Sequence, residues 1–381
     1  MSEINAKYKE KLLDAVEMSG FDFEYFVQDI FRKEKWTVLN NRYYIDDVSN
    51  IEREIDAIAY KAIEIGDICY YTALIISCKK TKESDWVFLT QKKIQDVNFD
   101  YSPLHIISSD FRLKAIINNE RSMIIDAIMK DEFLQKIYEG DNRVFANFQF
   151  NGRTLQLEEN RRIYDSISTT IKTLEAEKES HRNSMINKKA TFYCFYAISV
   201  FNNKLIEVLF EDSENKSVQE VNELKYVNRH IVYKKDQFYL VHFACKDYLA
   251  DLVKVYNKVF ESNTRLYSGL MASFYDDIWS YEYRVKLING QFMGALRREI
   301  SMISIIDNTF ELPSNLEIKE IDFQKTKDLL VMTVHFDPIL DSSTIELLNK
   351  SENAKKWIGA ALKRYFKYDG TYSINQDWLP F

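Results

Sequence analysis

The chain of 381 residues is poor in the amino acids that make loops flexible or that cross-link small domains: it has 9 Gly, 4 Pro and 4 Cys. So few Gly and Pro exclude long flexible linkers and low-complexity tracts, and no repeat with a period of roughly 20 to 50 residues is visible. No uncharged apolar run reaches about 18 residues, and residues 1–7 lack the basic-then-apolar plan of a signal peptide. We therefore expect a globular, cytoplasmic protein with no membrane partner.

Cysteine and histidine are scattered along the chain. The four cysteines stand singly without a CxxC pair, and the five histidines are equally dispersed. This spacing does not fit a zinc site, so we expect buried, reduced thiols in a reducing compartment. His242 lies in an apolar stretch and is better explained as a hydrogen-bonded core residue than as a catalytic base. No Ser-His-Asp arrangement, Walker loop or Gly-rich dinucleotide loop occurs, which excludes most other enzyme classes.

Two apolar segments carry the most informative pattern. Asp56 stands in the segment 54–59, and Lys79 ends the segment 74–79. The polar residues around Gly66 predict that the two segments form an antiparallel pair, with Asp56 and Lys79 side by side. Because side chains alternate along a strand, Ser77 and Lys79 share one face. Taken alone, Asp56 and Lys79 are better explained as an ion pair at the edge of a sheet.

The surrounding residues change this balance. An amphipathic helix begins at Gly20-Phe21-Asp22-Phe23-Glu24 and ends near Trp36, Arg53-Glu54-Ile55 precedes Asp56, and Lys80-Thr81-Lys82 and Trp86 follow Lys79. This ordered set resembles the PD-(D/E)XK restriction-endonuclease-like superfamily, in particular its Mrr-like members, over roughly residues 19–90. The resemblance implies an α/β fold with a mixed sheet flanked by helices. It also implies a hydrolase: a Mg²⁺-dependent or Mn²⁺-dependent endodeoxyribonuclease that binds DNA, in prokaryotic restriction or antiviral defence. A homo-oligomer or a partner protein of a defence system remains open.

Phosphodiester cleavage needs an activated water molecule and positive charge near the leaving oxygen. Asp56 suits the role of metal ligand, Lys79 can position the water, and the backbone carbonyl of Cys78 can add a ligand. Glu24 is a further source of negative charge, and its helix is expected to aim it at Asp56 or Lys79.

One position departs from the superfamily. Ser77 stands two residues before the lysine, where most relatives have an acid or an amide, and a hydroxyl is a poor replacement for a carboxylate at Mg²⁺. Candidates for a displaced second carboxylate are Glu83, Asp85 and Asp96.

The formal net charge of −7 argues mildly against a protein coated for nonspecific DNA binding. Local basic residues nevertheless follow the presumed active strand, where a phosphate backbone would pass: Lys80, Lys82, Lys92 and Lys93. A solvated surface explains these lysines equally well.

We predict two domains. Residues 1–260 form the nuclease-like domain, with a helical insertion at about 110–188, and residues 261–381 form a C-terminal α+β accessory domain of unknown role. Within the insertion, a helix over 110–139 and an extended stretch over 145–157 precede a polar helix that ends near residue 184, whose charged far end is expected in solvent. Residues 192–208 suggest a buried strand and a hairpin return. The last third predicts a helix over 267–283, strands over 316–323 and 329–336, and helices over 342–348 and 354–367.

Two other functions stay open. A catalytically inactive nuclease fold could serve as a nucleic-acid-binding or assembly subunit, for which Ser77 is the main evidence. Alternatively, a regulatory protein could sense a nucleotide or a protein through its C-terminal domain.

Overall fold

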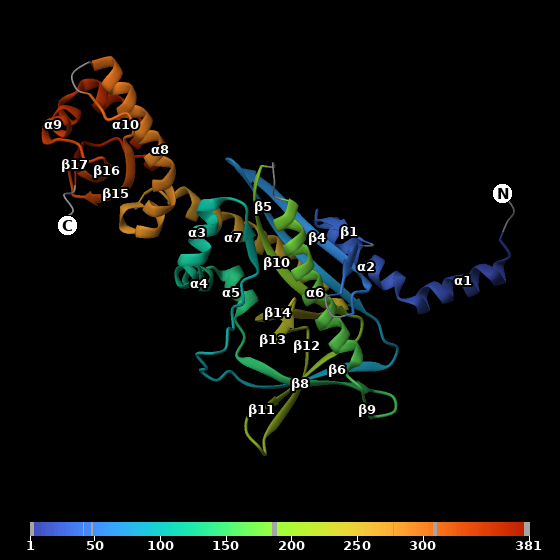
Figure 1. Ribbon diagram of the computed structural model, residues 1–381. Helices are drawn as coiled ribbons and strands as arrows, with labels where there is room; N and C mark the ends of the chain where they lie inside the picture. Colours follow the sequence, from blue (N-terminus) through green and yellow to red (C-terminus); the bar gives the residue numbers. More distant parts are fainter. Residues whose placement is uncertain are drawn as a thin grey trace. The chain divides into compact units, whose positions relative to one another are not determined.

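The structure is a computed structural model that describes residues 4–40, 42–46, 49–184, 189–276, 278–307 and 311–376. The chain divides into two compact units, Met1–Ser268 and Gly269–Phe381 (Figure 1). Among the described residues, none of the helices combines the length and the apolar character that crossing a membrane requires.

A mixed sheet of seven strands forms the centre of the first unit (Figure 1). Its strands are β1 (Thr37–Leu39), β4 (Ala57–Ile65), β5 (Ile68–Lys79), β10 (Ala190–Phe201), β14 (Lys235–Cys245) and β13 (Glu223–Val232) in spatial order, with β7 (Ile106–Ser108) paired to β10. Strand β4 runs antiparallel to β5, whereas β10 runs parallel to β5 and β14 runs parallel to β10. A separate ribbon of β2 (Arg42–Ile45) and β3 (Glu52–Ile55) precedes β4.

Helices cover both faces of this sheet. Helix α6 (Arg161–Ser184) packs on one face through Ile163, Ile167 and Ile171. Helix α7 (Leu249–Ala272) lies on the opposite face, where Asn263 bonds to Tyr196 and Thr72. Helix α2 (Phe21–Lys33) follows α1 (Ala6–Ser19). The segment after α2 is joined to α7, because Trp36 donates to Asn257 and Asn257 donates to Glu34. The result is a three-layer helix, sheet, helix arrangement.

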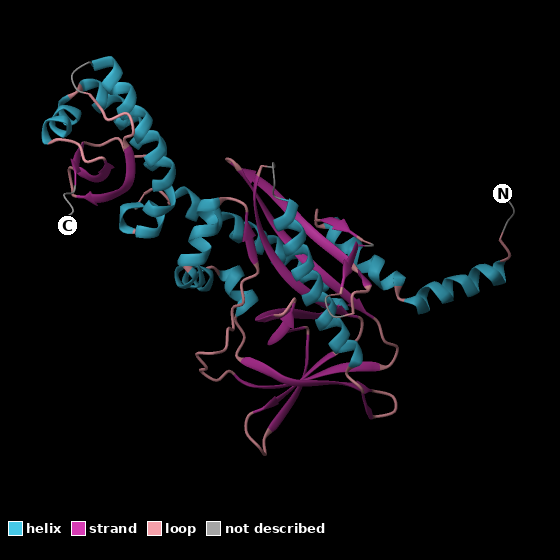
Figure 2. Ribbon diagram, viewed as in Figure 1, coloured by secondary structure: helices cyan, strands magenta, loops and turns pink. Residues whose placement is uncertain are grey.

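A second sheet packs against the first around one aromatic cluster (Figure 2). It contains β12 (Lys216–Val221), β11 (Leu205–Phe210), β6 (Ser84–Lys92), β8 (Asn142–Asn151) and β9 (Gln156–Glu158). Trp86 of this sheet stacks on Phe201 with ring centroids 4.0 Å apart and contacts Phe243 edge-on at 5.7 Å. The three rings are fully buried and tie the sheets together.

The hairpin predicted over residues 192–208 is wrong. Strand β11 pairs in parallel with β6 and leaves the sheet of β10, although the turn at Asn202 and Asn203 exists. Asn202 exchanges hydrogen bonds with the backbone of Thr81, which directs the chain toward β6. The turn residues therefore mark the end of β10 but do not fix the next pairing partner.

The polar helix also differs from expectation, because its charged far end is buried. Glu175, Glu177 and Lys178 each expose less than a tenth of their surface. Lys178 forms an ion pair with Glu175 at 2.6 Å, and Arg42 reaches Glu177 at 3.2 Å. A pair of opposite charges can be buried where a single charge could not. The apolar residues of the helix alone therefore underestimate how much of it is buried. The predicted extended stretch corresponds to β8 and β9, and the preceding helix consists of three short helices, α3 (Phe111–Asn119), α4 (Arg121–Lys130) and α5 (Glu132–Tyr138).

The second unit, described by itself, is α+β (Figure 2). Its three-stranded sheet has the order β15 (Glu317–Lys325), β16 (Leu330–Asp337), β17 (Tyr372–Gln376), accompanied by α8 (Glu282–Asp307), α9 (Ser342–Lys350) and α10 (Glu352–Phe366). The predicted strands and the last two helices are confirmed. The helix predicted over 267–283 is wrong, because α7 ends at Ala272 and a single 3-10 turn, η2 (Ile278–Ser280), precedes α8.

The aromatic cluster gives a test of how the two sheets depend on each other. Phe243→Ala is expected to lower the free energy of unfolding by about 3–5 kcal/mol, because it opens a cavity between two sheets. Val218→Ala, on exposed β12, is the matched control and should change it by less than about 0.5 kcal/mol. Urea denaturation followed by circular dichroism measures both. Equal effects of the two substitutions would contradict the role given to this cluster.

Candidate functional site

The predicted hairpin of Asp56 and Lys79 is confirmed. Strands β4 and β5 pair antiparallel, with Ala57 opposite Ile76, so Asp56 lies level with Ser77 at the end of the ladder. The Lys79 Nζ is 3.6 Å from Asp56 Oδ2. Both side chains are partly exposed, which leaves them accessible at the edge of the sheet.

Two hydrogen bonds and an ion pair hold a single oxygen of the Asp56 carboxylate. The backbone N–H of Cys78 donates to Oδ2 at 2.5 Å, the Ser77 hydroxyl donates at 3.3 Å, and the Lys79 ammonium forms the ion pair. No described residue donates a hydrogen bond to Oδ1. The carboxylate is therefore oriented by one oxygen, while the other is available to a ligand.

Glu24 lies at the margin of the buried face of α2, as predicted. Phe23 and Val27 of this helix are buried, and Glu24 beside them is half-buried. Burial raises the pKa of Glu24 to about 7; repulsion from Asp56 and Glu54 adds to the rise, and Lys79 opposes it. The prediction that Glu24 approaches Asp56 or Lys79 has this support: the charges of both act on its pKa, and Gln28, one turn further along α2, donates to the Asp56 carbonyl at 3.5 Å.

Ser77 lies in the interior of the sheet. Its side chain is fully buried, and its hydroxyl donates to Asp56. On the neighbouring strand its register partner is Ser199, whose hydroxyl lies 2.6 Å from that of Ser166 on α6. Ser77 is therefore placed to orient Asp56, without access to solvent.

The three candidates for a displaced second carboxylate are bound to other partners. Glu83 forms an ion pair with Arg153 at 2.7 Å, Asp85 accepts from the backbone N–H of Lys204, and Asp96 accepts from the N–H of Asn98.

The sequence reasoning missed Glu54, whose charge acts on Glu24. Its position two residues before Asp56 was the available signal, since alternate residues of an extended segment share a face.

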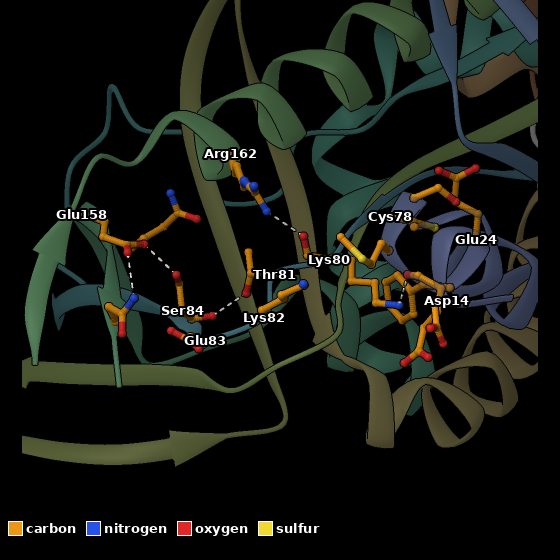
Figure 3. A pocket seen from close by; sticks show the side chains of 17 residues that line it. Asp14, Glu24, Cys78, Lys80, Thr81, Lys82, Glu83, Ser84, Glu158 and Arg162 are labelled. Atoms are coloured by element: carbon orange, nitrogen blue, oxygen red, sulfur yellow. Dashed lines mark hydrogen bonds between the residues drawn. The ribbon is translucent and has the colours of Figure 1, made fainter. Parts of the chain in front are cut away.

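A groove of about 1200 Å³ opens beside these residues (Figure 3). One wall comes from α1 and α2 with Asp14 and Glu24, and the other comes from Glu158 and Arg162. The loop from Lys80 to Ser84 lies between them, together with Cys78. The groove is thus lined by acidic and basic side chains from segments far apart in sequence.

The four candidate DNA-contacting lysines fall into separate places. Lys80 bonds to Asp22 at 3.1 Å and to the Glu17 carbonyl at 2.7 Å, so it fastens the loop to the corner between α1 and α2. Lys82 is exposed at the groove. Lys92 and Lys93 come at the opposite end of β6, and the Lys93 ammonium lies over the Tyr101 ring.

The donors around Asp56 fit a magnesium ion in part. Within the described part of the chain, no three His, Cys, Asp or Glu side chains gather closely enough to hold a metal by themselves. Mg²⁺ is commonly bound through one or two carboxylates, with water and substrate phosphate completing the shell. Asp56 and Glu24 supply two carboxylates. A strand residue directs its N–H and C=O to the same side, so the Cys78 carbonyl lies toward Asp56, beyond the last β4–β5 pair.

The prediction for His242 is confirmed, and the prediction of buried cysteines is confirmed for three of the four. His242 is buried, with its ring nitrogens 3.2 Å from the Tyr256 hydroxyl and 2.9 Å from Glu223. The four cysteines are free thiols, and all except Cys245 are buried.

Comparison of the chain with protein-family models, with curated proteins and with solved structures finds no match.

The raised pKa of Glu24 predicts a pH dependence of stability. A carboxyl group whose pKa is higher in the folded chain contributes stability that is complete below its unfolded pKa and is lost as the pH rises through about 7. Glu24→Gln removes this loss, so its stability relative to wild type should increase between about pH 5 and about pH 8. Urea denaturation in EDTA at both pH values measures the change. Glu10→Gln, on exposed α1, is the control and should show no such trend.

Proposed function

We propose that the protein is a metal-dependent nuclease that cleaves phosphodiester bonds of DNA, with its active site at Asp56, Lys79 and Glu24. The observation that carries this proposal is the meeting of two acids and a lysine at the end of β4 and β5, beside an open groove. Ion pairs at sheet edges are common, but a second, half-buried carboxylate repelled by the first is unfavourable unless a cation or a proton balances it.

The fold gives the proposal further support. The resemblance to PD-(D/E)XK nucleases implies a mixed sheet flanked by helices, with the acid and the lysine at the end of adjacent strands. The sheet around β4, β5 and β10 is mixed, and α6 and α7 cover its two faces. A role in restriction or antiviral defence comes from this resemblance alone.

The residues divide the chemistry in a simple way. Asp56 Oδ1, Glu24 and the Cys78 carbonyl would hold a Mg²⁺ or Mn²⁺ ion, which supplies Lewis acidity and lowers the pKa of a bound water. Lys79 is held by Asp56, so its ammonium stays beside the carboxylate, where it can orient the attacking water and stabilise negative charge on the phosphate. Its neighbours Cys78 and Lys80 line the groove. Ser77 and the Cys78 N–H keep Asp56 in place.

A second candidate is a nucleic-acid-binding protein that does not cleave. It is favoured by Ser77, which is fully buried and supplies no ligand, and by the two hydrogen bonds and the ion pair that already occupy Asp56 Oδ2. The groove and the exposed Lys82 would serve binding equally well. The two candidates differ in one measurable property, cleavage that depends on a divalent ion.

Cleavage of plasmid, linear and single-stranded DNA in Mg²⁺ or Mn²⁺, with EDTA as the blank, tests the proposal. Wild type should cleave at least one of these substrates. Asp56→Asn and Lys79→Ala should each lower the rate by at least about 100-fold, since each removes a group that acts on the reacting atoms. Asparagine is preferred to alanine at position 56 because it keeps an acceptor for the Cys78 N–H.

Matched controls come from the same unit. Asp67→Asn changes an exposed acid at the opposite end of the same hairpin, and Lys114→Ala changes an exposed lysine on α3. Both should cleave like wild type. If wild type leaves every substrate intact in both metals yet still binds DNA, the enzyme proposal fails and the second candidate stands.

A further inference from the structure

Three cations gather in a second pocket, where β6 and β8 meet β13. Lys93, Arg143 and Lys225 line it together with Tyr101, Gly140 and one acid, Glu139. The charges of Glu139 and Asp141 act on Lys93, and those of Glu223 and Glu139 act on Lys225, but no described carboxylate forms an ion pair with any of the three cations. Three cations that line one pocket without an ion pair can accept an anion from outside the chain.

The donors in this pocket are partly prepared for an anion. The Arg143 guanidinium lies over the Phe99 ring, 3.9 Å from its centroid, so its face is occupied while its N–H edge stays available. Its Nε is buried and has no hydrogen-bond partner within the described residues. The Lys225 ammonium is anchored at 2.8 Å by the Glu139 carbonyl, which leaves two of its hydrogens for a ligand.

Burial disfavours the charged form of two of these cations. It is the largest cause that lowers the pKa of Lys93 and of Lys225, although Glu139 and Asp141 oppose it at Lys93. At Lys225 the charge of Glu223 raises the pKa, and the charges of Lys136 and Lys93 lower it. A bound anion would favour the charged form of both lysines.

The size of the pocket restricts which ligands can bind. The enclosed space is about 20 Å³, enough for one water-sized group but not for a base or a sugar ring. A phosphate oxygen that enters from a strand lying across the mouth fits this space. A free nucleotide would leave its ring outside, without a pocket of its own.

We propose that Lys93, Arg143 and Lys225 bind a phosphodiester group of a nucleic-acid strand, at a site separate from the groove at Asp56. The inference rests on the proposed function in taking nucleic acid as the ligand. Strand β6 connects the two places, since Ser84 lines the groove and Lys93 directly follows Lys92, the last residue of β6. Its 9 residues span roughly 30 Å, which corresponds to about 9 base pairs of duplex.

The test measures the binding of two DNA hairpins. A stem of about 6 base pairs is too short to reach both places, whereas a stem of about 20 base pairs is long enough. The test uses the full chain carrying Asp56→Asn, in EDTA, so that cleavage plays no part. Lys93→Gln and Lys225→Gln should each weaken binding of the long hairpin and reduce its salt slope by about 1, while the short hairpin binds as before. Lys225→Arg keeps the charge and should keep the affinity.

Lys114→Gln is the control for the loss of one surface charge and should leave the salt slope for the long hairpin unchanged. Wild-type affinity and salt slope in both Gln variants would overturn the inference. So would saturable binding of orthophosphate or AMP that is lost in Lys225→Gln while hairpin binding is unchanged, because the pocket would then take a free anion. Absence of cleavage by wild type would overturn the proposed function and leave the hairpin result standing.

Discussion

The register of β5 is the constraint on which the candidate site depends. This strand pairs with β4 on one side and β10 on the other, and nearly all of its residues are buried. A shift by one residue would send every side chain to the opposite face, so the register is strongly fixed. It brings Asp56 level with Ser77, whose hydroxyl donates to the carboxylate, and Ser77 level with Ser199 on β10.

Charge is distributed unevenly on a protein whose net charge is −7. The groove is lined by both signs, the far end of α6 buries its charges as ion pairs, and the pocket at Lys93 keeps cations without an ion pair. The net charge of the chain does not predict the local charge at any of these places. An acidic protein can therefore present a local field that attracts phosphate, because short-range arrangement outweighs the screened contribution of distant charges.

The sequence predicts features that depend on neighbouring residues better than features that depend on contacts between distant segments. The hairpin of Asp56 and Lys79 is local, and the helical phase of Phe23 and Val27 locates Glu24, so both were predictable. The strand that pairs with β11 was not predictable, because Asn202 can end a strand without specifying which sheet the next strand joins. The burial of Glu175 and Lys178 depends on segments distant in sequence, such as the one that carries His105.

The buried ion pair of Glu175 and Lys178 also restricts how this sequence can change over time. Removing one partner of such a pair leaves an uncompensated buried charge and costs roughly 3–5 kcal/mol, whereas replacing both partners by apolar residues is often neutral. A lineage that changes one position at a time must pass through the costly intermediate. This stretch of α6 can therefore diverge readily only through paired substitutions, while the exposed faces of the same helix can drift one residue at a time.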